Sequence, residues 1–210
     1  MTAPEALTYD SLVSDIENYA ERHDEEFVSQ IPRIVMMAEN RLALEAKGLG
    51  QVNVVEGAFS ANNPVLKKPA LWRQTKSLFY VGADGRAVYL KPRKYEYCRL
   101  YALGEPAGNP EFYADYDYDH FFFAVTPATA FTFELSYYAR PEPLSDAVQV
   151  NWTTRNAPQL LLYACLLEAQ PWLKNLGMLS MWQSQYAQVL ASLQKEEAGF
   201  NHDATEAGQP

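Results

Sequence analysis

Apolar residues in the first fifty positions recur at steps of three and four, which is the period of an amphipathic helix. Two such series flank the acidic stretch HDEE, and their members are Leu12, Ile16 and Tyr19, then Ile31, Val35, Ala38 and Leu42. Pro32 suits the first turn of the second helix, and Gly48 is well placed as its C-terminal cap. The pattern therefore predicts two helices within residues 1–50.

The pattern changes between Gln51 and Ala139 to β-branched and aromatic residues separated by turn formers. VNVVEGAF is typical of a strand, and SLFYV and RAVYL flank GADG as a predicted hairpin. Asp84 and Gly85 would supply the positive φ angles that a tight turn needs. PRKYEYCRLYAL begins with a helix-start proline and has helical spacing, so a short helix near residues 92–103 is expected to interrupt the sheet.

Two aromatic segments, HFFFAV and FTFELSYYA, flank the turn TPATA and are predicted to form a pair of strands. The second segment alternates Phe131, Phe133, Leu135 and Tyr137 with more polar positions, as expected for a strand with one buried face.

The last third of the chain returns to a helical pattern. Asn156 is expected to cap a helix with Pro158 in its first turn, and LLLYACLL is apolar on every side, as in a helix surrounded by other elements. Pro171 ends or kinks that helix. A final helix carries one apolar stripe through Leu179, Trp182, Tyr186, Val189 or Leu190, and Leu193. Residues 198–210 are small and polar, which predicts a flexible C-terminal arm.

These elements predict an α+β fold with a discontinuous organisation. Residues 1–50 and 151–197 would form a helical hub in which the N-terminal and C-terminal helices meet. Residues 51–150 would form an inserted antiparallel β-rich domain.

Composition limits the classes of function. The chain has 210 residues, 48% of them apolar, and a formal net charge of -9, which argues against bulk affinity for nucleic acid. Its two cysteines suggest neither a disulfide framework nor a Cys-rich zinc site. The N-terminus lacks the pattern of a signal peptide, and the longest apolar run is far too short to span a bilayer, so a soluble protein is expected.

Charge is unevenly distributed along the chain. Residues 67–99 carry nine basic and two acidic side chains, which leaves the remainder strongly acidic. Such a subunit can pair a basic face with a neighbour's acidic face. The alternative is that these are ordinary solvated strand and turn residues.

Little in the sequence indicates catalysis or a cofactor. The three histidines lack metal-ligand spacing, and no nucleophile elbow or phosphate-binding loop is present. DYDYDH, residues 115–120, imitates the opening of a calcium loop but has His120 where a glycine is wanted and Thr126 where a glutamate is wanted. A solvated turn between strands is the competing interpretation. We expect no metal, no cofactor and no enzymatic activity.

The many aromatic residues also allow a carbohydrate-binding β-domain of a phage receptor-recognition protein, in which exposed rings such as Trp72 would stack on sugars. An unrecognised metal-dependent hydrolase is a further alternative.

The ordered combination of segments resembles a known family. The stretches SLVSDIENYAERHDEEFVSQIPRIVMMAENRL, VTPATAFTFELSYYARPEPLSD, the Asn151-Trp152 pair followed by LLLYACLLEAQPWLKN, and MWQSQYAQVLASLQ are similar to the phage head-to-tail connector, or adaptor, proteins that include tail tubular protein A. Two departures from the family pattern are LKKPALWRQTKSLFY and the acidic DYDYDH turn.

The resemblance implies a virion protein of the neck, assembled in the cytoplasm of the host bacterium, that forms a ring of about twelve copies. The ring would bind the portal on one side and tail or nozzle proteins on the other, and DNA would pass through its lumen without specific binding. Phe200, Asn201 and His202 in the tail are candidates for portal docking. Candidates for charge pairing between subunits are Lys67, Lys68, Arg93 and Lys94 with Asp115, Asp117 and Asp119.

Overall fold

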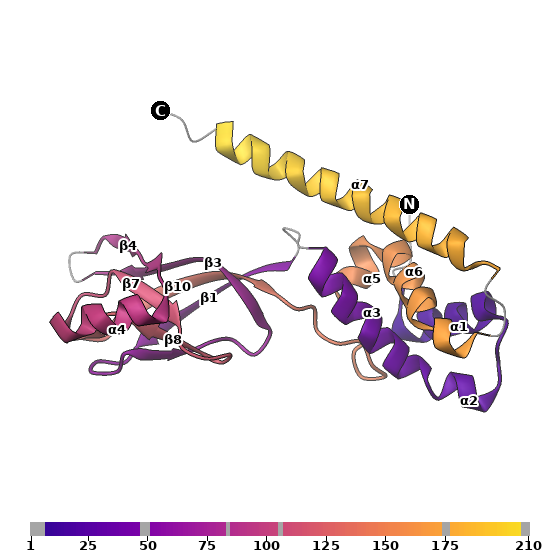
Figure 1. The fold of residues 1–210 in the computed structure, drawn as a ribbon, viewed down its shortest axis with the longest axis horizontal. Helices are drawn as coiled ribbons and strands as arrows, with labels where there is room; N and C mark the ends of the chain where they lie inside the picture. The colour runs from indigo at the N-terminus through magenta and orange to yellow at the C-terminus, as the bar shows by residue number, and fades with distance from the viewer. Residues whose placement is uncertain (1–6, 47–50, 83–84, 105–106, 174–176, 207–210) are drawn as a thin grey trace. The chain divides into compact units, whose positions relative to one another are not determined.

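The computed structural model describes residues 7–46, 51–82, 85–104, 107–173 and 177–206, with side chains as far as residue 196 (Figure 1). The chain divides into two compact units. The helical unit comprises Met1–Gln51 and Pro141–Pro210, and the β-rich unit comprises Val52–Arg140. Helix and mostly antiparallel sheet are thus combined as an α+β fold, as predicted.

The helical segments that the structure describes in the helical unit differ greatly in length. They are α1 (Tyr9–Ala20), α2 (Glu25–Val28), α3 (Ile31–Glu45), α5 (Trp152–Asn156), α6 (Pro158–Glu168), the short 3-10 segment η2 (Gln170–Trp172) and α7 (Leu179–Glu206).

Helix α1 begins where the sequence supplies a reciprocal cap. The Thr8 hydroxyl accepts from the Ser11 N–H at 3.2 Å, and the Ser11 hydroxyl accepts from the Thr8 N–H at 2.9 Å. These two bonds satisfy backbone donors that a helix start leaves unpaired. Behind this cap, Leu12 and Ile16 are completely buried, as their spacing predicted, whereas Tyr19 is exposed.

Helix α3 confirms the second predicted series, because Ile31, Val35, Ala38 and Leu42 are all buried. Pro32 stands in its first turn, as expected. The helix ends at Glu45 with Ala46 as its C-cap, and the predicted cap Gly48 lies outside the described residues.

The start of the C-terminal helices differs from the prediction. Asn151, and not Asn156, is the capping asparagine: its Oδ1 accepts from the N–H groups of Thr153 and Thr154 at 2.9 and 3.2 Å and begins α5. Asn156 is the last residue of α5, so it cannot cap the next helix. Helix α6 instead starts at Pro158 without a side-chain cap.

Helix α6 occupies the centre of the helical unit, and its apolar residues are buried on several faces as LLLYACLL predicted. Its core includes buried residues from α1 and α3 as well as Tyr186 from α7. The Tyr186 hydroxyl donates to Glu45 Oε2 at 2.6 Å, and Gln194 Nε2 donates to the Glu45 carbonyl at 3.0 Å. Segments from both ends of the chain thus contribute to one core.

Helix α7 extends further than the sequence suggested. Residues 198–210 were expected to form a flexible arm, whereas the structure continues α7 through Glu206, past the helices it packs against (Figure 1). Residues 207–210 lie outside the described part of the chain.

In the part of the β-rich unit that the structure describes there are ten strands and one helix, α4 (Tyr95–Gly104), which confirms the short helix expected near residues 92–103. The strands are β1 (Val52–Phe59), β2 (Val65–Lys67), β3 (Trp72–Val81), β4 (Ala87–Tyr89), β5 (Lys91–Pro92), β6 (Ala107–Gly108), β7 (Phe112–Asp115), β8 (His120–Phe123), β9 (Thr126–Pro127) and β10 (Phe131–Ala139). They form sheets in the orders β1-β10-β3-β4, β2-β8-β7-β5 and β6-β9. Two short pairs, β5 with β7 and β6 with β9, are parallel.

Strand β10 lies at the centre of the first sheet and shows the predicted alternation, with Phe131, Leu135 and Tyr137 buried. The predicted pairing of HFFFAV with FTFELSYYA is wrong, because β8 pairs with β2 and β7 while β10 pairs with β1 and β3. Both segments are strongly apolar, and they face each other across the core between two sheets instead of sharing hydrogen bonds. The hairpin from β3 to β4 is present, and Gly85 has the expected positive φ of 77°. Asp84 lies outside the described residues.

The connection from the β-rich unit back to the helices was assigned to the β-rich domain from the sequence. The structure places residues 141–150 with the helical unit. The reason is a set of hydrogen bonds that sequence pattern does not reveal: the Tyr9 N–H donates to the Gln149 carbonyl at 2.8 Å, and the Leu144 N–H donates to the Glu39 carboxyl group at 3.3 Å.

Candidate functional site

Lys68 is a buried cation in the β-rich unit, although it follows directly after the exposed Lys67. Its side chain is 3% exposed, and Nζ lies 3.8 Å from the ring centre of Trp72 and 4.9 Å from that of Phe121. The same Nζ contacts Asp115 Oδ1 at 2.8 Å and donates to the Asp117 carbonyl at 3.0 Å. Two aromatic faces and two oxygens together compensate for the desolvation of this charge.

The acidic turn DYDYDH connects β7 to β8, and its aspartates are exposed, as expected for a solvated turn. His120 Nδ1 lies 2.9 and 3.0 Å from the two carboxylate oxygens of Asp117, and the Asp119 N–H donates to Asp117 Oδ1 at 2.8 Å. Desolvation raises the pKa of Asp117, but the hydrogen bonds from His120 and Asp119 outweigh it, and the net pKa is lowered. The turn is held by its own side chains and by Lys68.

These contacts concern residues for which charge pairing between subunits was predicted. Lys68 and Asp115, two of those residues, pair with each other within one chain. The Asp117 carboxylate is occupied by His120 and Asp119 in the same turn. The sequence could not reveal this arrangement, because Trp72 and Phe121 surround Lys68 only after the sheets form.

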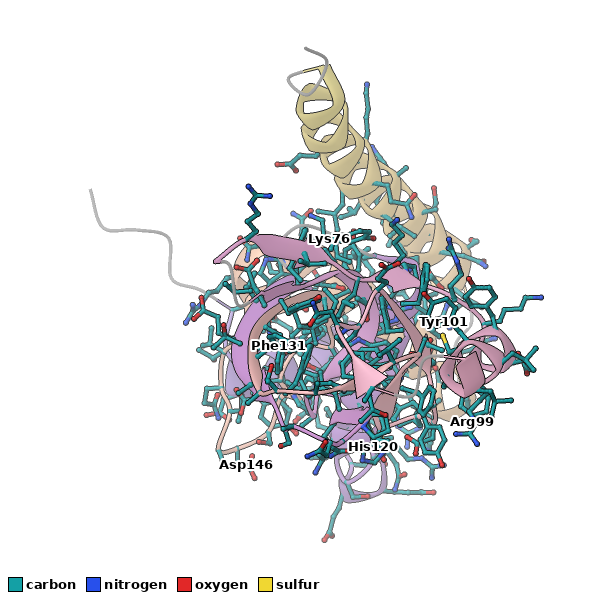
Figure 2. All side chains as sticks on the ribbon, turned by 90° about the vertical axis from the view of Figure 1, so that its left-hand side faces the viewer. Lys76, Arg99, Tyr101, His120, Phe131 and Asp146 are labelled. Atoms are coloured by element: carbon teal, nitrogen blue, oxygen red, sulfur yellow. The ribbon has the colours of Figure 1, made fainter. Side chains whose placement is uncertain are left out.

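The other predicted cations, Lys67, Arg93 and Lys94, are exposed. Arg93 precedes α4, and its guanidinium group lies 5.2 Å from the ring centre of Phe112. On α4 itself, the Arg99 guanidinium lies 5.6 Å from the ring centre of Phe122, and Figure 2 shows this side chain at the periphery of the β-rich unit. The helix and the turn before it thus present a basic surface.

The outer face of α4 is also apolar. Its inner face places Cys98 against the second sheet, together with Tyr95 and Tyr101. On the opposite side, Leu100 and Leu103 are 71% and 81% exposed. They are one helical turn apart and therefore adjacent on the helix surface. The helix was predicted from the sequence, but this exposed pair was not. The spacing of Leu100 and Leu103 from Cys98 places them on the opposite side of the helix and could have revealed them.

The Trp72 ring, which the carbohydrate-binding alternative needs as an exposed surface, is partly buried and makes three contacts within the β-rich unit. Lys68 Nζ lies over the ring, Phe121 packs edge-on against it at 5.7 Å, and the indole N–H donates to the Thr75 hydroxyl at 3.1 Å. Trp72 is therefore part of the internal structure of the β-rich unit.

The helical unit has a groove of about 310 Å³ where the N-terminus of α1 meets the junction of α2 with α3. The apolar part of its lining is Tyr9, Val13, Val28, Ile31 and Pro32, and its polar part is Asp10 and Asp146. Both carboxylates are exposed. Sequence reasoning did not find this groove, because Asp146 is distant in the chain from the other lining residues.

A partly buried polar junction joins α3 to the connection formed by residues 141–151. Glu39 Oε1 accepts from Asn151 Nδ2 at 2.8 Å, and both carboxyl oxygens lie 3.3 Å from the Leu144 nitrogen. Asn151 Nδ2 also donates to the Glu142 carbonyl at 2.9 Å. Burial raises the pKa of Glu39 to about 7, against the opposing effect of the hydrogen bonds from Leu144 and Asn151. This junction holds the chain where it returns to the helical unit. Its sequence signal was Asn151 as a helix cap, which the sequence analysis assigned to Asn156 instead.

Three predicted docking residues, Phe200, Asn201 and His202, lie within α7, and their side chains are outside the described part. Among the residues that the structure describes, no group of three or more His, Cys, Asp or Glu side chains is arranged to hold a metal ion. Within that same part of the chain, every helix is too short or too polar to cross a bilayer.

Charge is divided between the two units. The helical unit has seven basic and seventeen acidic residues, a balance of -10, while the β-rich unit has ten basic and nine acidic residues, a balance of +1. Together these give the -9 of the whole chain. The helical unit is therefore acidic, and the β-rich unit is nearly neutral and carries a basic surface.

Comparison with known proteins gives one family match. The model of the family described as SU10 adaptor protein matches residues 7–206, which include both units. No curated protein matches the chain.

Proposed function

Because the chain belongs to the SU10 adaptor protein family, a family of phage head-to-tail adaptors, we propose that it forms a ring between the portal and the tail in the virion neck. Membership makes it a structural phage adaptor and confirms the resemblance found in the sequence. The observation that carries the proposal is the extent of the match, which includes nearly the whole of both units. The neck protein would be assembled in the host cytoplasm and would need no enzymatic activity.

The helical unit is the proposed hub of the ring, and the β-rich unit is the inserted domain. A closed ring uses heterologous interfaces, in which one surface of each copy contacts a different surface of the next. The unequal charges of the two units suit such contacts, because complementary surfaces favour the correct neighbour and disfavour wrong ones. The ring would contain about twelve copies of this chain.

Helix α7 is the proposed contact with the portal. Its first part is fixed to the helical unit through Trp182, Tyr186 and Gln194. The twelve residues from Lys195 to Glu206 add roughly 18 Å of helix at 1.5 Å per residue. Such an extension can reach a partner, and Phe200, Asn201 and His202 are the residues proposed to dock there.

The acidic net charge supports a lumen through which DNA passes without specific binding. DNA carries a dense array of phosphates, and a basic channel would retain it. A negatively charged wall repels the phosphate backbone and allows the DNA to slide. Tail or nozzle proteins would bind the opposite side of the ring from the portal.

Reconstitution with the portal protein of the same phage tests this function. We expect the purified chain to be monomeric or weakly associated and to form rings on the portal, visible by negative-stain electron microscopy. A chain without residues 198–210 should lose most of its portal affinity. A matched chain with Lys76→Glu, an exposed change on β3, should bind normally. Absence of rings on the portal for the unaltered chain would refute the proposed function.

A further inference from the structure

The outer face of α4 is apolar and basic, and the groove of the helical unit is lined by apolar residues and two carboxylates. The α4 face, defined by Leu100, Leu103 and Arg99, is an exposed apolar ridge with a basic side chain beside it. The groove has the exposed carboxylates of Asp10 and Asp146 and an apolar lining, of which Val13, Val28 and Pro32 are accessible while Tyr9 and Ile31 are buried. We propose that the α4 face of one copy docks in the groove of the next copy in the ring.

The apolar part of this contact follows from exposure. Leu103 and Leu100 are the two most exposed large hydrophobic residues in the described part of the chain, at 81% and 71%. Because they are adjacent on one helix, they form a continuous ridge of the kind that helices place in apolar grooves. The groove of about 310 Å³ is at the lower end of the ~300–1,000 Å³ typical of binding pockets.

Charge complementarity is the argument for a second copy as the occupant. The described residues from Lys91 to Gly104 carry four cations, Lys91, Arg93, Lys94 and Arg99, and one carboxylate, Glu96. An acidic partner is therefore favoured, and the helical unit of another copy, with its balance of -10, is acidic. The two surfaces differ, so each copy can use its α4 face on one side and its groove on the other, as a closed ring requires.

The proposal rests on the ring of the proposed function and adds the residues that join its subunits. It also gives the exposed predicted cations Arg93 and Lys94 a place beside the interface. Lys68, which pairs with Asp115 inside its own unit, takes no part.

Cross-linking between two different variants tests the contact directly. One preparation carries Leu103→Cys and the other carries Val13→Cys, and they are mixed before assembly on the portal. A short bismaleimide can then join the two introduced cysteines only between different copies. The two native cysteines, Cys98 and Cys165, are completely buried. The matched control replaces Val13→Cys with Leu44→Cys, which is exposed in α3 but does not line the groove.

We expect a covalent dimer from the Leu103→Cys and Val13→Cys mixture and at least about 10-fold less from the control mixture. Rings that form without this dimer, or a cross-link from Leu103→Cys to the portal alone, would overturn the α4 contact and leave the proposed function intact. Failure of the unaltered chain to form rings would instead refute the proposed function, and the contact with it.

Charge reversal provides an independent measurement. Arg99→Glu should weaken ring formation on the portal by about 10-fold, equivalent to ~1.4 kcal/mol, whereas Lys76→Glu, an equal charge change elsewhere on the β-rich unit, should have little effect. Asp146→Lys combined with Arg99→Glu should restore ring formation. If the loss of ring formation in the double variant equals the sum of the losses in the two single variants, Arg99 and Asp146 do not meet and the proposed orientation is wrong.

Discussion

Replacing Glu39 with glutamine should remove a pH dependence of stability from the helical unit. The Glu39 carboxyl group is half-buried and contacts the Leu144 N–H and the Asn151 side chain. Burial raises the pKa of Glu39 from 4.5 to about 7, because desolvation penalises the charged form more than the two hydrogen bonds favour it. The amide of the Glu39→Gln variant would keep an acceptor for one of these donors but could not ionise.

The sign follows from the raised pKa. Between pH 4.5 and about 7 the unfolded chain has already released the Glu39 proton, whereas the folded chain retains it. Stability is therefore fully present below pH 4.5, falls as the pH rises through this window, and levels off above about 7. At ~1.4 kcal/mol for each pH unit, the loss over this window is at most ~3.5 kcal/mol. Because part of the carboxyl group meets solvent, we discount this to ~1–2 kcal/mol.

Urea unfolding followed by circular dichroism at 222 nm, which reports mainly on the helices, measures the effect at pH 5, 6, 7 and 8. The stability of Glu39→Gln relative to the unaltered protein should increase by ~1–2 kcal/mol from pH 5 to pH 8. Glu142→Gln, an exposed carboxylate in the same connection, is the matched control and should leave the pH dependence unchanged. Equal slopes for the unaltered protein and Glu39→Gln would refute the reasoning.

Three further substitutions test other parts of the fold. Asn151→Ala removes the α5 cap and the donor to Glu39, so it should lower the free energy of unfolding by ~2–3 kcal/mol in urea titrations; a loss under ~0.5 kcal/mol would contradict the junction. Gly57→Ala would place Cβ 2.7 Å from the Phe133 ring, which is stacked on Phe59, so it should cost ~1–3 kcal/mol in thermal unfolding. Gly104→Ala, with nothing within 4 Å, is its control and should be neutral. Tyr186→Phe removes the hydrogen bond to Glu45 and should cost ~1.5 kcal/mol, compared with no change for the exposed Tyr19→Phe.

The spacing of apolar residues correctly predicted the elements that bury a single face, such as α3 and β10. The α3 series from Ile31 to Leu42 and the alternation along β10 are both present, because a helix or strand with one buried face must place apolar residues at that period. The start of α5 was missed because both Asn151 and Asn156 precede helical segments. Only the accepted bonds from Thr153 and Thr154 distinguish the true cap.

The remaining differences come from contacts between distant residues. Nothing beside Lys68 in the sequence indicates that Phe121, beyond the α4 helix, will cover it. The separation of β8 from β10 likewise depends on which strands pair across the unit, since both sequences fit either sheet. The groove combines Asp146 with residues of α1 and α3, so neither its shape nor its charge could be deduced from a single segment.

The insertion of the β-rich unit between α3 and α6 has a consequence for synthesis on the ribosome. Helix α3 is complete at Glu45, but α6 begins only at Pro158. At ~5–20 residues per second, roughly 6–23 s pass before α6 can cover the apolar side of α3. During that interval β1 and β10 can pair, with Val52 opposite Tyr138, and close the inserted unit. The nascent chain can thus close its inserted middle unit while its earliest helices still lack α6, the partner that covers them in the folded protein.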